Sequence, residues 1–228
     1  THDQSSAASD VYKRQLEEDG HSWEVVHLDE GQEIPSIDSF DGLWVLGGPM
    51  DVWQEQDYPW LKKEKAFIKM AVEEKGIPFL GLCLGHQLLA ESLGGVVGKS
   101  ETAEVGVMEV QLTEEGASGI LFDGIPEKIS CLQWHGAEIK KLPAGAKVLA
   151  TSKDCAVQAM SWGPRAYSMQ FHVEIEHSTI ADWATISEYA DSLKAALGPS
   201  GQEKLEKDCA VHILSLIHIS EPTRRTII

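Results

Sequence analysis

The feature of this sequence that most clearly predicts a chemical function is a cysteine flanked by glycines. The segment Gly81-Leu82-Cys83-Leu84-Gly85 follows an apolar run and precedes a helix pattern, which makes it the cysteine form of the G-x-S-x-G turn. The glycines let neighbouring backbone approach closely, and a helix start places partial positive charge beside the thiol. Because the thiolate is the reactive form of cysteine, we predict that Cys83 is a nucleophile rather than a buried structural residue.

A nucleophilic thiol needs a general base, and the base needs a group that orients it. Of the nine histidines, His172 is the best placed, because it directly follows a strand pattern at residues 166–171 and parallel sheets present functional groups at their carboxyl ends. Glu174 lies two residues further on, where it can hold the imidazole by a hydrogen bond. We therefore predict a triad of Cys83, His172 and Glu174.

A glycine pair after another apolar run predicts a site that stabilises a reaction intermediate. Gly47-Gly48-Pro49 ends this run, and glycine lets a backbone N–H group come close to a ligand. The N–H groups of Gly48 and Leu84 are candidates for an oxyanion hole, in which each donor contributes on the order of 3 kcal/mol.

These residues need a scaffold whose strands end side by side, and the first half of the chain predicts one. Short β-branched or apolar runs alternate with helix patterns, as in a parallel sheet wrapped by helices. The predicted strands are residues 23–28, 43–46 and 77–82, and the predicted helices are residues 59–75 and 84–93.

The second half of the chain has a different pattern, with short strands and little helix between them. The predicted strands are residues 105–112, 128–133, 147–151, 157–162 and 166–171, and a helical pattern resumes over residues 178–197. Such a succession favours antiparallel or mixed pairing. We expect it to extend the same sheet within one domain.

Both ends of the chain carry segments that are unusual for a natural domain. Residues 5–15 read SSAASDVYKRQ and residues 214–224 read LSLIHISEPTR; both resemble in-frame translations of adapters used to build sequencing libraries. Segments of this kind are excluded from fold reasoning. We therefore expect one domain at residues 16–213, truncated at both ends with a first strand missing, and non-native tails at residues 5–15 and 214–228.

The bulk properties exclude several classes of function. The net charge of −17 disfavours nucleic acid and anionic membrane surfaces as partners, and no apolar run reaches the roughly 18 residues of a membrane helix. The four cysteines form no CxxC pair, which suits a reducing compartment such as the cytoplasm. Cysteine and histidine spacings typical of a zinc site are not evident, so we expect no metal.

Three motifs in order resemble those of the class I glutamine amidotransferases. GLCLGHQ is similar to the nucleophile motif of that family, FHVE to its His-x-Glu motif and VLGGP to its oxyanion loop. The resemblance implies an α/β fold, a flavodoxin-like three-layer sandwich. Its central sheet is expected to be mostly parallel, with helices on both faces and a mixed or antiparallel extension in the second half.

The resemblance also implies a reaction and a set of binding residues. Cys83 would attack the γ-carboxamide of glutamine or a γ-glutamyl amide and form a thioester that water hydrolyses, without a cofactor. Gln87 occupies the position that contacts glutamine in the family. The segments similar to those that line the glutamine pocket contribute Glu104, Gly106, Trp134 and His135.

One departure from the family and several alternatives bear on the function. Val173 replaces the proline of the usual His-Pro-Glu motif, which suits the stand-alone, GMP-synthetase-like amidotransferases, a branch that includes γ-glutamyl peptidases. The chain is then either an amidotransferase subunit that works with a separate synthetase or a free-standing γ-glutamyl hydrolase. A catalytically silent binding domain on the same fold is a third alternative. A flavodoxin-like cysteine hydrolase or chaperone ranks last, because its histidine would adjoin the cysteine.

Overall fold

The computed structural model describes residues 16–175 and 178–220, with residues 213–220 described by their backbone only. One mixed sheet forms the centre of the molecule, and its strands lie in the order β1-β2-β7-β6-β5-β3-β4. The strands are β1 (Leu43–Val45), β2 (Phe79–Leu82), β3 (Val96–Leu112), β4 (Lys128–Lys141), β5 (Ala146–Thr151), β6 (Ala159–Trp162) and β7 (Ala166–Met169).

The pairing within the sheet divides it into two parts. β2 pairs in parallel with β1 on one side and with β7 on the other. All other neighbours, from β7 through β6, β5 and β3 to β4, pair antiparallel. The expectation of a mostly parallel sheet is therefore wrong, because short connections between the later strands impose antiparallel pairing. The expected antiparallel extension in the second half is confirmed.

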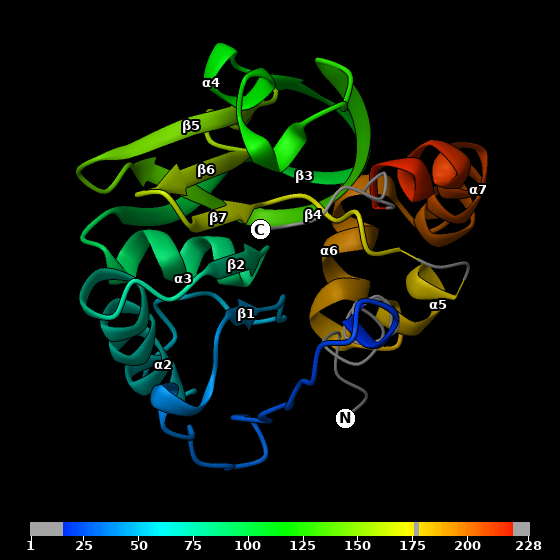
Figure 1. Ribbon diagram of the computed structural model, residues 1–228. Helices are drawn as coiled ribbons and strands as arrows, with labels where there is room; N and C mark the ends of the chain where they lie inside the picture. Colours follow the sequence, from blue (N-terminus) through cyan, green and yellow to red (C-terminus); the bar gives the residue numbers. More distant parts are fainter. Residues whose placement is uncertain (1–15, 176–177, 221–228) are drawn as a thin grey trace.

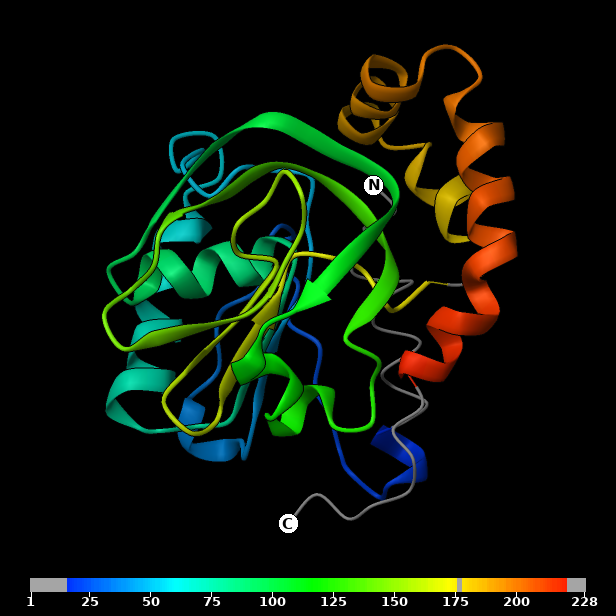
Figure 2. The same cartoon turned by 90° about the horizontal axis from the view of Figure 1, so that it is seen from above.

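Helices lie on both sides of the sheet (Figures 1 and 2). In Figure 2, α2 and α3 lie on one side of the sheet, and α5, α6 and α7 lie on the other. The helices are α2 (Trp60–Lys69), α3 (Leu84–Ser92), α4 (Glu114–Ala117), α5 (Thr179–Trp183), α6 (Ser187–Leu197) and α7 (Gly201–Ser220). Short 3-10 segments occur at Ile37–Ser39 and Ile120–Phe122.

The helix predicted over residues 59–75 forms, but its last turn differs from an α-helix. α2 ends at Lys69, and Met70–Glu74 continues it as a π-helix. Gly76, with φ +63, follows the helix and adopts a conformation that glycine reaches at little cost. The chain therefore reverses direction at Gly76 and continues into β2.

Two apolar cores, one on each side of the sheet, hold the layers together. One core joins α2 and α3 to the sheet through residues such as Leu61, Ile68 and Leu88. The other joins α5, α6 and α7 to β3 and β4 and includes Trp183 and Leu205. Each face of the sheet thus buries its own set of apolar side chains, as expected for helices on both faces.

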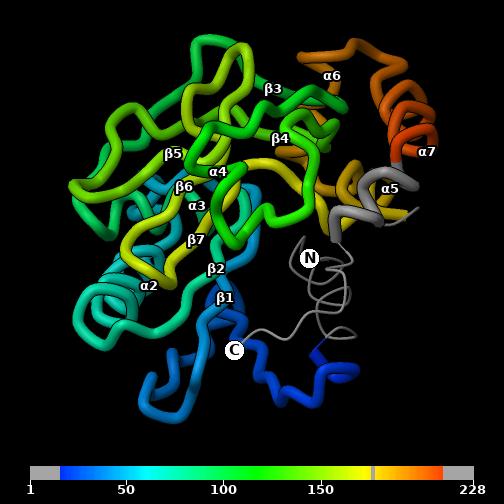
Figure 3. The backbone as a smooth tube through the Cα atoms, turned by 45° about the horizontal axis from the view of Figure 1, so that its top comes forward, coloured from blue at the N-terminus to red at the C-terminus, as the bar shows by residue number. Residues whose placement is uncertain are grey.

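The strand predicted at residues 23–28 does not form. These residues are irregular and lie apart from the sheet (Figure 3). β1 is the edge strand of the sheet among the described residues, and residues 23–28 do not pair with its free edge. A strand requires a partner for its backbone groups, and a favourable residue pattern cannot replace that partner.

The segments at the ends of the chain are only partly described. The predicted tail at residues 5–15 lies outside the described residues, as do residues 221–228. α7 continues to Ser220, within the stretch predicted to be a non-native tail. Within the described part of the chain, no helix combines the length and apolar character that crossing a membrane requires.

Close contact between α3 and the parallel strands explains both glycines that flank Cys83. A Cβ atom at Gly85 would lie 2.0 Å from the backbone oxygen of Val45, a distance that only movement of the helix or strand could relieve. A Cβ atom at Gly81 would lie 2.6 Å from the backbone oxygen of Gly85. Glycine at both positions therefore allows α3 to start directly against β1 and β2.

We expect Gly85→Ala to lower the free energy of unfolding by about 2 kcal/mol or more, because the methyl group overpacks a backbone contact. Urea denaturation monitored by circular dichroism would measure the change. Gly136→Ala is the matched control, since a Cβ atom there meets nothing within 4 Å, and its unfolding free energy should stay within about 0.5 kcal/mol. Equal stability of Gly85→Ala and the unsubstituted protein would contradict this packing explanation.

Candidate active site

Three neighbouring parallel strands deliver the predicted functional residues to one edge of the sheet. β1 leads into Gly47 and Gly48, β2 ends directly before Cys83, and β7 ends shortly before His172. β2 lies between the other two strands, so Cys83 is central. Because parallel strands end on the same edge, segments far apart in the sequence converge there.

Cys83 has a strained backbone that separates β2 from α3. Its φ of 51° and ψ of −104° make it the one non-glycine residue with positive φ in the described part of the chain. Its N–H group donates to the carbonyl of Met169 in β7 at 2.9 Å, and its own carbonyl accepts from the N–H groups of His86 and Gln87. Such conformations cost about 1–3 kcal/mol and persist only where the surroundings enforce them.

His172 and Glu174 form a buried pair beside this turn. The Nδ1 atom of His172 lies 2.6 Å from Oε1 of Glu174, and the N–H group of Val173 donates to the other carboxylate oxygen at 2.9 Å. Both side chains are almost completely buried. The second ring nitrogen, Nε2, has no hydrogen-bond partner of normal geometry among the described residues, which leaves it available on the side of Cys83.

The electrostatics of the pair favour a protonated imidazole. Burial disfavours charge on His172, but the Glu174 carboxylate and the Cys83 side chain outweigh it and raise the pKa of His172 to about 10. Burial also opposes charge on Glu174, yet the imidazole holds the pKa of that carboxyl below its usual value. Near neutral pH, a protonated His172 therefore lies between an ionised carboxylate and the thiol, ready to donate a proton.

A pocket of about 140 Å³ opens beside Cys83. Gly48 and Leu84, the predicted oxyanion-hole residues, line it together with Cys83. A Cβ atom at Gly48 would lie 2.6 Å from Sδ of Met50 and 3.0 Å from Cδ2 of Leu84, so glycine keeps this loop close to the start of α3. The arrangement places two backbone segments next to the thiol.

The structure brings only some of the predicted binding residues to the pocket. Gln87, Trp134 and His135 line it, whereas Glu104 and Gly106 do not. The Gln87 side chain donates to Oε1 of Gln170 at 3.0 Å. The alternating orientation of strand residues explains the difference in β3, because Val105 lines the pocket and its two neighbours point away.

Both ring nitrogens of His135 face oxygen atoms, although Nε2 makes no hydrogen bond of normal geometry among the described residues. Nδ1 lies 3.0 Å from the carbonyl oxygen of Ala137, and Nε2 lies 3.0 Å from Oε2 of Glu104. His135 can therefore present only its carbon edge or ring face to a substrate. Glu104 supports the pocket wall from behind rather than contacting the pocket.

Residues of α5 and α6 that sequence reasoning missed complete the pocket. Glu188, Tyr189 and Ser192 line it from α6. The Trp183 ring of α5 packs against His172, with centroids 4.8 Å apart, and Trp134 donates to Ser192 through its indole N–H at 2.7 Å. No local motif marks these residues; only the packing of α5 and α6 against β4 reveals their role.

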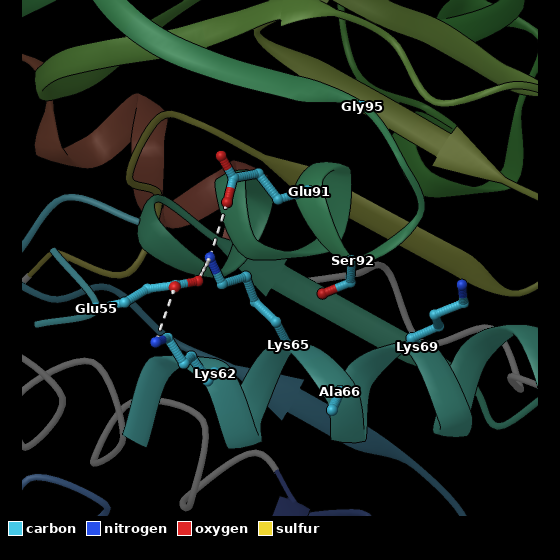
Figure 4. A pocket seen from close by; sticks show the side chains of 8 residues that line it. All are labelled: Glu55, Lys62, Lys65, Ala66, Lys69, Glu91, Ser92 and Gly95. Carbon is cyan, nitrogen blue, oxygen red and sulfur yellow. Dashed lines mark hydrogen bonds and ion pairs between the residues drawn. The ribbon is translucent and has the colours of Figure 1, made fainter. Parts of the chain in front are cut away.

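A second, more open hollow of about 480 Å³ lies between α2 and the end of α3 (Figure 4). Its central cation, Lys65, lies 2.6 Å from Glu55 and 2.9 Å from Glu91, and Glu55 also approaches Lys62 at 3.6 Å. These lysines are thus neutralised within the chain. No cysteine or histidine lines the hollow, so we assign it to the surface ion pairs that link the two helices.

We expect Glu174→Gln to lower the titration midpoint of His172 by about one to three pH units, because it removes the neighbouring negative charge that raises this pKa. Histidine ring signals in NMR spectra recorded against pH would measure the midpoint. Glu188→Gln, a neutralisation at the exposed pocket rim, serves as the control and should change it little. An unchanged midpoint in Glu174→Gln would show that Glu174 does not set the charge of His172.

Comparison with curated proteins identifies relatives that are named as subunits of GMP synthase. The chain is 41% identical over 107 residues to a subunit of the glutamine-hydrolyzing GMP synthase of Thermococcus kodakarensis, an alignment that covers 46% of this chain and 55% of that protein. It is 35% identical over 148 residues to the corresponding GMP synthase subunit of Methanocaldococcus jannaschii, covering 64% and 71%. The chain thus spans little more than half the length of the first of these relatives.

Solved structures and a family profile agree with these relatives. A glutamine amidotransferase from Thermotoga maritima superimposes with a TM-score of 0.78 at 27% identity, covering 92% of this chain and 88% of that one. A sequence profile described as glutamine amidotransferase class-I matches residues 2–183. This match spans most of the chain and contains the Cys83 turn, the Gly48 loop and the His172–Glu174 pair, and the chain therefore belongs to the class-I glutamine amidotransferase family.

Proposed function

We propose that the protein hydrolyses the γ-carboxamide of glutamine, or of a closely related γ-glutamyl amide, through a thioester on Cys83. The observation that carries the proposal is the convergence of Cys83 and the buried His172–Glu174 pair at the edge where β1, β2 and β7 end. The adjoining pocket, about 140 Å³ in volume, opens directly beside Cys83.

The proposed reaction assigns a role to each residue at this edge. The Cys83 thiolate attacks the amide carbon, and the N–H groups of Gly48 and Leu84 stabilise the oxyanion that forms. His172, protonated because its pKa is raised, donates its proton to the leaving nitrogen as the C–N bond breaks. Ammonia or an amine departs, and Glu174 keeps the imidazole oriented.

Hydrolysis of the thioester completes the cycle. His172, now neutral at Nε2, accepts a proton from water, which attacks the thioester carbon. The carbon–sulfur bond breaks, glutamate leaves and the thiolate is restored beside a protonated His172. These steps consume only the amide and one water molecule, so they need no redox reagent and no phosphate donor.

A free-standing γ-glutamyl hydrolase is a second candidate for the same site. One wall of the pocket is formed by α6 of this chain, through Glu188, Tyr189 and Ser192. The chain therefore does not need a partner subunit to supply that wall, as suits a free-standing enzyme. The alternative, an amidotransferase subunit that passes ammonia to a synthetase chain, draws its support from the relatives that are named as subunits of GMP synthase.

Two further expectations belong to this proposal. The flavodoxin-like three-layer arrangement is supported by the parallel trio β1, β2 and β7 and by the helices on both sides of the sheet. A reducing compartment such as the cytoplasm is supported by the state of the four cysteines, all of which are free.

We expect Cys83→Ala to lower the rate of glutamate release by about 10³-fold or more, because the thioester can no longer form. A coupled glutamate assay with glutamine as the substrate would measure it. Cys209→Ser replaces a buried thiol of α7 outside the pocket and should retain the activity. Equal loss in both variants would point to a folding defect, and equal activity would exclude Cys83 as the nucleophile.

We expect the isolated chain to release glutamate from both glutamine and a γ-glutamyl dipeptide, since one acyl site serves both and only the leaving group differs. Specificity constants for the two substrates would measure the preference. Release from the dipeptide alone would favour the hydrolase, and release from glutamine alone would favour the amidotransferase subunit. Release from neither, with Cys83 inert toward a thiol reagent, would identify a silent binding domain.

A further inference from the structure

A buried cluster of potential metal ligands lies behind the wall of the pocket. Glu104 of β3, His135 of β4 and Cys155 of the β5–β6 connection place a carboxylate oxygen, a ring nitrogen and a thiol sulfur within 4.8 Å of one another. All three residues are at most 6% exposed. They come from separate segments of the chain, so the tertiary fold rather than a local motif assembles them.

The chemistry of the three donors matches one class of ion. Thiolate, imidazole and carboxylate together are the ligands of zinc and of similar divalent transition metals, which bind them at about 2.0–2.3 Å. Atoms already grouped within 4.8 Å need only side-chain adjustments to reach such distances. Calcium and magnesium prefer sets made of oxygen alone, so the sulfur and nitrogen exclude them as the natural occupants.

A second observation points to a ligand in this cluster. Gln158 is completely buried, and its Oε1 atom has no hydrogen-bond partner among the described residues. The same amide donates through Nε2 to Oε2 of Glu104 at 2.7 Å and to Oγ of Ser152 at 3.1 Å, which fixes it at the cluster. An acceptor buried without a partner is costly, and a cation would satisfy it.

The charge of the cluster leads to the same conclusion. Glu104 is buried, and the interactions found for it in the described part of the chain come from His135, Ser152 and Gln158, without a lysine or arginine. Nε2 of His135 lies 3.0 Å from Oε2 of Glu104 but makes no hydrogen bond of normal geometry among the described residues, so a buried ring nitrogen and a buried carboxylate face each other there. A metal ion at Nε2 would supply positive charge to His135 and Glu104 together.

We propose that Glu104, His135 and Cys155 form a binding site for a zinc-type divalent transition metal, with Oε1 of Gln158 as the fourth donor. Binding releases the thiol proton of Cys155 and any proton on Nε2 of His135 to solvent. His135 also lines the pocket beside Cys83, so one residue of the cluster belongs to the pocket wall. The bound metal ties β3, β4 and the β5–β6 connection together behind the pocket wall. This inference does not depend on the proposed hydrolysis.

Cobalt absorption spectroscopy tests the site directly, because a cobalt–thiolate bond gives a charge-transfer band in the near ultraviolet. The measurement uses the full chain with Cys83→Ala, which removes the thiol beside His172 as a competing ligand. We expect the band to grow with added Co²⁺ and to saturate at one ion per chain. Absence of the band at saturating Co²⁺ would overturn the proposal.

Two further variants in the Cys83→Ala background identify the ligand. Cys155→Ser should abolish the charge-transfer band and weaken Co²⁺ binding about 10- to 100-fold or more, at least the loss seen when a supporting hydrogen bond of a metal site is removed. Cys209→Ser is the matched control, a buried cysteine on α7 away from the cluster, and should keep the band. A band that persists in Cys155→Ser would assign the thiolate elsewhere and overturn the site.

Anomalous diffraction gives an answer that does not require Cys155→Ser to fold. Crystals of the Cys83→Ala protein grown with Zn²⁺ should show an anomalous peak at the zinc absorption edge between Glu104, His135 and Cys155. A peak confined to other residues, or no peak, would mean that the cluster is a hydrogen-bonded network held by protons, and the proposal would fail.

Discussion

The strained turn at Cys83 is the constraint on which the rest of this structure depends. A residue with a side chain holds φ of 51° there, and the surrounding contacts must offset that strain. The N–H bond from Cys83 to Met169 of β7 holds the turn from one side. Glycine at positions 81 and 85 lets α3 begin in direct contact with the backbone of β1. The thiol is therefore lifted from the sheet at the N-terminus of a helix.

The two parts of the sheet contribute differently to the site. The parallel trio of β1, β2 and β7 brings the Gly47–Gly48 loop, the thiol and the imidazole to one edge. The antiparallel part builds the pocket wall through β3 and β4, and α6 completes it. Trp134 and Trp183, whose ring centroids lie 5.7 Å apart, connect this wall to the aromatic surroundings of His172. Excluding water in this way strengthens the electrostatic interactions of the buried pair.

Two buried pairs of histidine and glutamate lie close to the pocket, and their surroundings distinguish them. His172 uses one nitrogen for Glu174 and leaves the other on the side of Cys83. His135 uses one nitrogen for a backbone carbonyl and the other for Glu104. The first arrangement allows a proton to move to and from a substrate. The second anchors a wall and, with Cys155, provides ligands for a cation. Identical residue types thus have different chemistry because their second partners differ.

The sequence by itself determined the local features of this protein, and the tertiary structure decided those that depend on distant partners. Glycine spacing around Cys83 and the short interval from His172 to Glu174 act over a few residues, so the turn, α3 and the pair were predictable. Strand formation at residues 23–28 was not, because a residue pattern does not by itself align a segment with a partner strand, and these residues do not pair with β1, the edge of the sheet. The orientation of Glu104 away from the pocket and the contribution of α6 likewise followed from packing between elements far apart in the chain, which no local pattern encodes.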